Sequence, residues 1–204
     1  MKNIRTVITA LLVFTPFAAN ADLIVNSDGK LVGATGVDVG GTLYDVVFAD
    51  GTCIDVFTGC DEQSDFTFGN GADAAEASQA LLDQVLVDGA LGMFDSDPLL
   101  TNYCLIISAR PDLSVCGITT GYGIDAPSGE VLIAFADNWD DPARDAAYDV
   151  GAVVPPAYNL GPPNTDFFAE ANIWAVWSVP EPGTLALLSL GLAGMGLTRR
   201  RKKV

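Results

Sequence analysis

The last 26 residues of the chain, from Val179 to Val204, combine features that a protein core accommodates poorly. A Pro-Glu-Pro triplet is followed by an uncharged, Leu-rich run at 183–197 and then by five consecutive basic residues. As a helix this run spans about 22 Å, short of the roughly 30 Å hydrocarbon core of a bilayer. Burying it in a protein core would also bury its basic neighbours, whereas at a membrane surface they reach water and anionic lipid. We therefore predict a membrane segment, with everything before Gly183 outside the cytoplasm.

This tail resembles the PEP-CTERM sorting domain, which is also catalogued as the ice-binding protein C-terminal domain. The resemblance is carried by a sorting motif, the short Leu/Gly-rich span and a basic membrane stop: Val179, Pro180, Glu181 and Pro182, then Arg199, Arg200, Arg201, Lys202 and Lys203. It implies recognition by an exosortase, a membrane protease or transpeptidase of Gram-negative bacteria that make extracellular polysaccharide. The tail would be removed at the inner membrane and the remainder released or attached outside. An ordinary one-span anchor is the alternative.

Residues 1–21 have the pattern of a secretory signal peptide. Lys2 and Arg5 form its basic start, residues 7–18 its apolar run, and Ala19 and Ala21 an A-x-A cleavage site. An apolar run of this length is too short to favour a permanent anchor. We therefore expect three parts: a signal peptide at 1–21, an acidic passenger domain at 22–178, called the body below, and the sorting signal at 179–204.

The body is strongly acidic. It holds 25 of the 26 acidic residues but three of the ten basic ones, so its net charge is −22. Such a surface repels nucleic acid and anionic lipid, which disfavours a nucleic-acid partner, and it could attract divalent cations or basic surfaces. Solubility in an exported protein is the simpler explanation.

The four cysteines are expected to form disulfides, because an exported chain meets an oxidising compartment. Three pairings are possible. Cys53–Cys60 and Cys104–Cys116 are the local choices, and each closes a short loop. A zinc site is disfavoured, because the sequence has no CxxC pair and no histidine.

The first part of the body predicts a β-meander. Strand-like segments at 23–25, 31–39 and 42–49 are separated by Asp28-Gly29, a two-residue type I′ hairpin signal, and by the tight turn Gly40-Gly41. Gly33 and Gly36 predict a bulge in the second strand. Asp50-Gly51 then turns the chain towards Cys53.

From Asp73 the spacing of apolar residues changes from that of a strand to that of a helix, which predicts one amphipathic helix. Asp73 to Glu76 fits a capping box, and Gly89 supplies a stop signal. Between them an apolar stripe falls on one face: Ala74, Ala77, Leu81 and Val85, broadened by Leu82 and Leu86. We expect this stripe to pack on the sheet.

The remainder predicts short buried strands at 104–108, 131–136 and 173–178, with regular structure disfavoured in the Pro-rich stretch 142–163. Trp174 and Trp177, three residues apart in the last strand, should point to opposite faces, one into the core and the other exposed or stacked. The fold class is therefore α+β: a β-rich secreted domain with an N-terminal β-meander and one amphipathic helix packed on the sheet, between a signal peptide and a C-terminal transmembrane helix.

The absence of histidine from all 204 residues excludes Ser-His-Asp and Cys-His sites. Carboxylate chemistry is what remains, since two suitably spaced acids can hydrolyse a glycosidic bond. The densest cluster holds Asp137, Asp140 and Asp141 around Trp139, with Asp145 beyond. It is expected to be a solvated acidic loop, with calcium or glycan binding as the alternative and catalysis as the weakest. The pair Asp95 and Asp97 is a second candidate for oxygen ligands, with the same order of alternatives.

We thus expect a non-catalytic exported protein, sorted by an exosortase to the cell envelope or the extracellular polysaccharide matrix, where it acts as a structural or binding module. Before processing it would be a single-pass protein of the inner membrane. No cofactor is expected, apart from calcium as an open alternative. A carboxylate-dependent glycan hydrolase, or a calcium- or glycan-binding surface protein, is the competing hypothesis.

Overall fold

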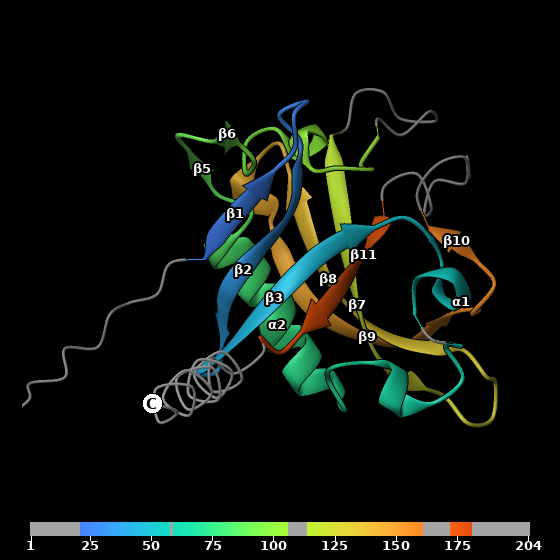
Figure 1. Cartoon of the computed structure of the whole chain (residues 1–204). Helices are drawn as coiled ribbons and strands as arrows, with labels where there is room; N and C mark the ends of the chain where they lie inside the picture. The colour runs from blue at the N-terminus through green and yellow to red at the C-terminus, as the bar shows by residue number, and fades with distance from the viewer. Residues whose placement is uncertain (1–20, 58, 106–113, 161–171, 181–204) are drawn as a thin grey trace, which may run out of the picture.

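The computed structural model describes residues 21–57, 59–105, 114–160 and 172–180 (Figure 1). A seven-stranded sheet with the order β1-β2-β3-β11-β7-β8-β9 forms its centre. The helix α2 (Gly71–Gln84) packs against β2, β7, β8 and β9 on one face of this sheet. The seven strands are β1 Asp22–Val25, β2 Leu31–Val39, β3 Thr42–Ala49, β7 Val115–Ile124, β8 Val131–Trp139, β9 Ala146–Val154 and β11 Asn172–Ser178. The described chain is therefore β-rich, with one long helix on the sheet, and is compatible with the predicted α+β class.

Short elements complete the described chain. Two two-stranded ribbons pair β4 with β10 and β5 with β6. The bounds are β4 Gly51–Thr52, β5 Asp88–Gly89, β6 Gly92–Met93, β10 Asn159–Leu160 and α1 Cys53–Val56, with 3-10 turns at Gln63–Asp65, Pro98–Leu100 and Pro142–Arg144. The predicted signal peptide, apart from Ala21, and the predicted transmembrane run 183–197 lie outside the described residues.

The predicted meander is confirmed: β1, β2 and β3 pair antiparallel in chain order. The bulge predicted from the glycines of β2 is also present, because the β2–β3 register shifts between Ala34 and Val37. Gly40 and Gly41 have φ angles of +59° and +86°, and Val39 lies opposite Thr42. Positive φ at both central residues is what a type I′ turn requires. This is the β2–β3 turn.

The first turn was predicted wrongly as a two-residue type I′ hairpin. The amide of Asn26 donates to the carbonyl of Lys30 at 2.9 Å, and the amide of Gly29 donates to the carbonyl of Asn26 at 3.1 Å. Gly29 has a positive φ of +76°, whereas Asp28 does not take a positive φ. The Asn26 side-chain oxygen accepts from the amides of Asp28 and Lys30 at 2.9 and 3.0 Å. This local asparagine bonding selects a longer loop that ends in a left-handed glycine.

The predicted helix exists, but both of its ends are shifted. Asn70, and not Asp73, is the N-cap, and its side-chain oxygen accepts from the Asp73 amide at 3.0 Å. The helix ends at Gln84, and Gly89 instead belongs to the β5–β6 ribbon. The predicted stripe is confirmed, because its members are buried except Leu82, which is partly buried: Ala74, Ala77, Leu81, Val85 and Leu86.

The sequence analysis missed one central strand of the sheet. Cys104 and Leu105 are not in a strand, and the rest of the predicted 104–108 strand lies outside the described residues. The strand is β7, which begins at Val115 and contains three glycines. A Cβ atom added at Gly121 would lie 2.6 Å from a ring carbon of Phe66. The Phe66 ring therefore packs directly on the strand backbone, and this long-range contact explains a glycine that weakens the local strand signal.

The Pro-rich stretch holds more regular structure than predicted. Nine residues of it form β9, which pairs antiparallel with β8 from Val131↔Val154 to Asp137↔Ala146. Pro142 precedes this strand and Pro155 follows it. No proline therefore removes a ladder hydrogen bond, and the exposed edge of β8 supplies the partner that a local sequence signal cannot reveal.

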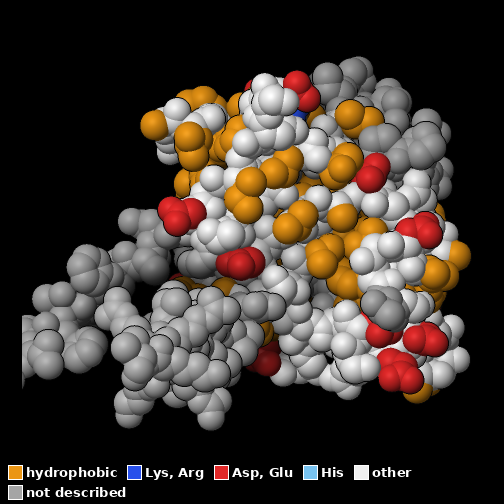
Figure 2. Space-filling model, in the orientation of Figure 1, with side chains coloured by type: hydrophobic (Ala, Val, Ile, Leu, Met, Phe, Trp, Pro, Cys, Tyr) orange, Lys and Arg blue, Asp and Glu red, His pale blue; other side chains and the backbone are white. Residues whose placement is uncertain are grey.

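Both faces of the sheet are covered around β11. One hydrophobic core lies between the sheet and α2, and a second core lies on the opposite face, near α1 and the segment that follows it. The outer face of β1–β3 is not covered by described residues, and Ile24, Leu43 and Val47 are exposed there. Figure 2 shows hydrophobic side chains spread over this face, with carboxylates scattered around them.

Candidate functional site

The predicted sorting motif follows the middle strand of the sheet without a linker. β11 ends at Ser178, which is paired with Asp45 of β3. Val179 comes next and is 62% exposed, and Pro180 is half-buried. Glu181 and Pro182 lie outside the described residues, as does the basic membrane stop at 199–203. The fold therefore continues up to the first residue of the motif.

β11 is held on both of its edges. It pairs antiparallel with β3 from Trp174↔Ala49 to Ser178↔Asp45, and parallel with β7 from Asn172↔Gly117 to Trp174↔Thr119. This predicted final strand thus joins the N-terminal meander to the three C-terminal strands. Without this strand, the sheet would divide into two three-stranded parts, β1-β2-β3 and β7-β8-β9.

Trp177 anchors β11 in the core beneath α2. Its indole nitrogen donates to the Thr120 hydroxyl at 3.2 Å, and its ring meets Phe68 edge-on with centroids 5.5 Å apart. The backbone oxygen of Trp177 accepts from the Thr67 hydroxyl at 2.6 Å. One residue before the end of the strand, the chain is therefore fixed by packing and by hydrogen bonds.

Trp174 anchors the same strand in the opposite core. Its indole nitrogen donates to the Gly51 carbonyl at 3.0 Å, and its ring meets Phe57 edge-on at 5.5 Å. The two tryptophans thus point to opposite faces, as predicted. Both are buried and both are stacked, because this part of the sheet is covered on both sides.

Both local disulfides are formed. Cys53 and Cys60 are joined with Cα atoms 5.8 Å apart, and Cys104 and Cys116 with Cα atoms 5.5 Å apart. Cys53–Cys60 belongs to the core near α1, whereas Cys104 and Cys116 lie in the core beneath α2. Of the three possible pairings, the structure has the local one.

The acidic segment 137–141 is only partly the loop that was predicted. Asp137 lies within β8, where it accepts a 2.6 Å hydrogen bond from the Tyr148 hydroxyl of β9. Burial raises the pKa of Asp137, although this hydrogen bond lowers it. Asp141 caps the 3-10 turn at Pro142–Arg144 by accepting from the Ala143 amide, and Asp140 is exposed. Asp137 therefore belongs to the strand, whereas Asp140 and Asp141 lie in the turn after it.

A different carboxylate group forms at this end of the sheet, consisting of Asp95, Asp137 and Asp145; we call it the Asp145 group. Asp145 accepts from the Trp139 amide at 2.8 Å and is hydrogen-bonded to Asp95. Burial, and then the carboxyl groups of Asp95 and Asp137, raise the pKa of Asp145 to about 6, against the effect of the Trp139 amide. The sequence predicted Asp95 as a partner of Asp97. The structure joins it instead to an acid 50 residues away.

The Asp145 group does not have the form of a metal site. Within the described ranges, no three Asp, Glu, Cys or His side chains gather closely enough to hold one ion. The nearby Asp88 carboxylate is also engaged within the protein, because it accepts hydrogen bonds from the amides of Asp95 and Ser96 at 3.0 and 3.1 Å. Beside the group, the Arg144 guanidinium lies 3.7 Å from the centre of the half-buried Trp139 ring, so a cation already occupies the face of this aromatic side chain.

The raised pKa of Asp145 predicts that stability falls as pH rises from about 4 to about 6. In this window the unfolded chain has lost a proton that the folded chain still holds, so the free energy of unfolding decreases. We expect a loss of about 1 kcal/mol, after a discount for solvent screening. Asp145→Asn keeps an oxygen for the Trp139 amide and should remove most of this dependence. Urea unfolding of both proteins from pH 4 to 7 tests it, and equal pH dependence would contradict it.

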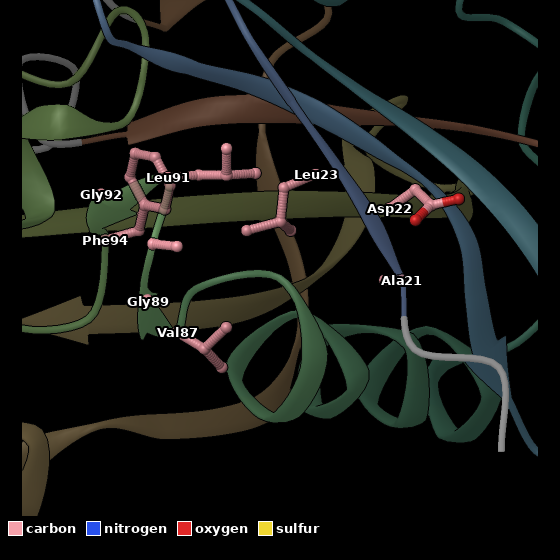
Figure 3. Close-up of a pocket in the computed structure, with 9 residues that line it drawn as sticks. Ala21, Asp22, Leu23, Val87, Gly89, Leu91, Gly92 and Phe94 are labelled. Carbon is pink, nitrogen blue, oxygen red and sulfur yellow. The ribbon is translucent and has the colours of Figure 1, made fainter.

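A cavity of about 300 Å³ lies at the start of the body, between β1 and the β5–β6 ribbon. Figure 3 shows its lining, which is mainly apolar and includes Ala21, Leu23, Leu91 and Phe94. Asp22 is the charged residue among those that line it. The lining of the cavity brings no pair of acids together. Of the predicted cleavage residues, Ala21 lies here and Ala19 lies outside the described residues.

The comparisons with known proteins identify the tail. A family model for the PEP-CTERM protein-sorting motif matches residues 178–202. The chain therefore carries this motif, which in general marks an exported protein that an exosortase sorts from a membrane-held precursor. The curated proteins and the solved structures gave no match. The helices of the described chain include none that is both long and apolar enough to cross a membrane.

Proposed function

We propose that this chain is an exosortase substrate whose body acts outside the inner membrane as a non-catalytic structural or binding module. Its place would be the cell envelope or the extracellular polysaccharide matrix of a Gram-negative bacterium. The observation that carries the proposal is the junction at Ser178, where the matched motif begins at the last residue of the middle strand. The motif is thus attached to a body that is folded to its end, and Val179 is exposed for recognition.

The composition of the body supports an extracellular, non-catalytic role. Two disulfides close its loops, as suits an oxidising compartment. Its net charge of −22 suits a soluble surface that repels anionic lipid once the tail is gone. With no histidine in the chain, the usual general base of hydrolases is missing.

The sorting function is tested by replacing Pro180, Glu181 and Pro182 together by alanine, which keeps the length of the chain. In a host that carries the exosortase, we expect this variant to keep its C-terminal tail while the unmodified chain loses it. Intact mass reports the tail directly. A matched control replaces Pro155 and Pro156 by alanine. The backbone carbonyls of these two prolines accept hydrogen bonds, and alanine keeps both carbonyls. Tail removal that is unchanged in the triple variant would contradict the sorting function.

A glycan hydrolase is the second candidate, and the Asp145 group is the observation that favours it. A carboxyl group with a pKa of about 6 beside other acids is what a general acid requires. The test incubates the mature protein with matrix polysaccharide and measures new reducing ends. Activity that is lost in Asp145→Asn and in Asp137→Asn would establish the hydrolase, and no new reducing ends would support the non-catalytic module.

A further inference from the structure

The two ends of the body leave the sheet in one row. Asp22, where β1 begins, is opposite Thr35 of β2, and Ser178, where β11 ends, is opposite Asp45 of β3. The bulge of β2 places these two pairs side by side, because the amide of Gly36, the residue after Thr35, donates to the Asp45 carboxylate at 3.0 Å. Four adjacent strands separate the two ends by about 14 Å, at roughly 4.8 Å for each of three steps. Both predicted targeting segments are therefore attached to the same end of the sheet.

The β2–β3 turn projects beyond this row. From Asp45, opposite Ser178, β3 runs back three residues to Thr42 and then into Gly41 and Gly40. At about 3.3 Å per residue, the turn extends about 10–13 Å past the end of β11. In Figure 1 the β2–β3 turn and the end of β11 lie together, at the opposite end of the sheet from the turn between β1 and β2.

The length of the tether sets how far this end can stand from a membrane. Four residues, from Val179 to Pro182, separate the end of β11 from the apolar run that begins at Gly183. Fully extended, they reach about 14 Å at most. This is close to the projection of the β2–β3 turn. While the tail is held in the membrane, the end of β11 therefore stays within about 14 Å of the bilayer, which is close to the distance by which the β2–β3 turn projects.

We propose that, in the membrane-held precursor, the body stands end-on with the β2–β3 turn facing the lipid surface. This inference rests on the proposed sorting function, which supplies the membrane anchor. Asp22, Asp38, Asp45 and Glu76 lie near this end, whereas the described basic residues Lys30 and Arg144 lie in the β1–β2 turn and beside Trp139. An anionic lipid surface repels these carboxylates, so the tether, and not lipid affinity, holds the turn close to the membrane.

Single engineered cysteines test this orientation, because all four native cysteines are in disulfides. Thr42→Cys places a thiol beside the β2–β3 turn, and the matched variant Ser27→Cys places one in the β1–β2 turn; both positions are exposed. Each full-length precursor is prepared in membranes of a host without the exosortase and treated with a bulky polyethylene-glycol maleimide. The unmodified precursor is the control for background labelling.

We expect Thr42→Cys to react several-fold more slowly than Ser27→Cys in membranes, and at the same rate after the membranes are dissolved in detergent. The detergent measurement removes any intrinsic difference between the two thiols. Equal rates in intact membranes would overturn the orientation while leaving the sorting function untouched. Recovery of the precursor in the soluble fraction would instead contradict the sorting function, and the orientation with it.

Discussion

A chain that ends at Ala171 should have no stable fold, whereas a chain that ends at Ser178 should fold fully. The difference is β11, which lies between β3 and β7 and holds the two halves of the sheet together. Its loss removes Trp174 and Trp177 from the two cores, and truncating one buried tryptophan costs about 3–5 kcal/mol. The loss of Ile173 and of two ladders adds to this, against a typical total stability of about 5–15 kcal/mol.

Both chains are exported behind the native signal peptide and compared by near-ultraviolet circular dichroism and urea unfolding. The chain ending at Ser178 should show a fixed aromatic spectrum and one cooperative transition, and the shorter chain neither. Trp177→Phe in the longer chain is a milder control, since it keeps an aromatic ring and loses the hydrogen bond to Thr120, worth about 1 kcal/mol. A cooperative transition in the shorter chain would show that β11 is dispensable, and the fold would then not constrain where the tail is cut.

Loss of the Cys104–Cys116 disulfide should destabilise the body by about 3 kcal/mol, because the bond restricts a loop in the unfolded chain. The partners are 12 residues apart, and Cys116 is buried in β7 next to the parallel ladder with β11. Loss of Cys53–Cys60, which closes a seven-residue separation, should cost somewhat less by the same reasoning.

Paired substitution by alanine separates the two bonds, because alanine adds no polar group to either core. Urea unfolding of the two double variants and of the unmodified mature protein measures each loss, with the m-value checked for constancy. We expect the Cys104/Cys116 variant to be the less stable of the two. A loss below about 0.5 kcal/mol for both variants, the size of an ordinary surface substitution, would contradict the structural role of the disulfides.

The elements that the sequence predicted well are those whose signals are local. The bounds of β2 and β3 follow from strand-forming residues between glycine turns, and the stripe of α2 follows from its period alone. The shifted helix start shows the limit of such signals, since Asn70 and Asp73 are both good caps and their neighbours decide between them.

The elements that were missed depend on partners far away in the chain. β7 contains three glycines and is a strand because β8 and β11 flank it and Phe66 packs on Gly121. β9 forms within a Pro-rich stretch because β8 offers it an edge. The Asp145 group likewise joins Asp95 and Asp145, and no local pattern connects them. The sorting motif was found because its residues are contiguous and need no folded context.

The intact mass of the mature protein, purified from its own host, tests the central claim most directly. We predict a chain that begins at Asp22, retains every residue through Ser178, lacks the apolar run and basic stop, and has lost four cysteine hydrogens to two disulfides. The cut breaks one peptide bond that lies after Ser178. The carbonyl carbon of that bond gains the oxygen of water or the nitrogen of an acceptor amine, and the new amino terminus leaves with the tail. A mass that extends from Met1 to Val204, or a C-terminus inside β11, would contradict this.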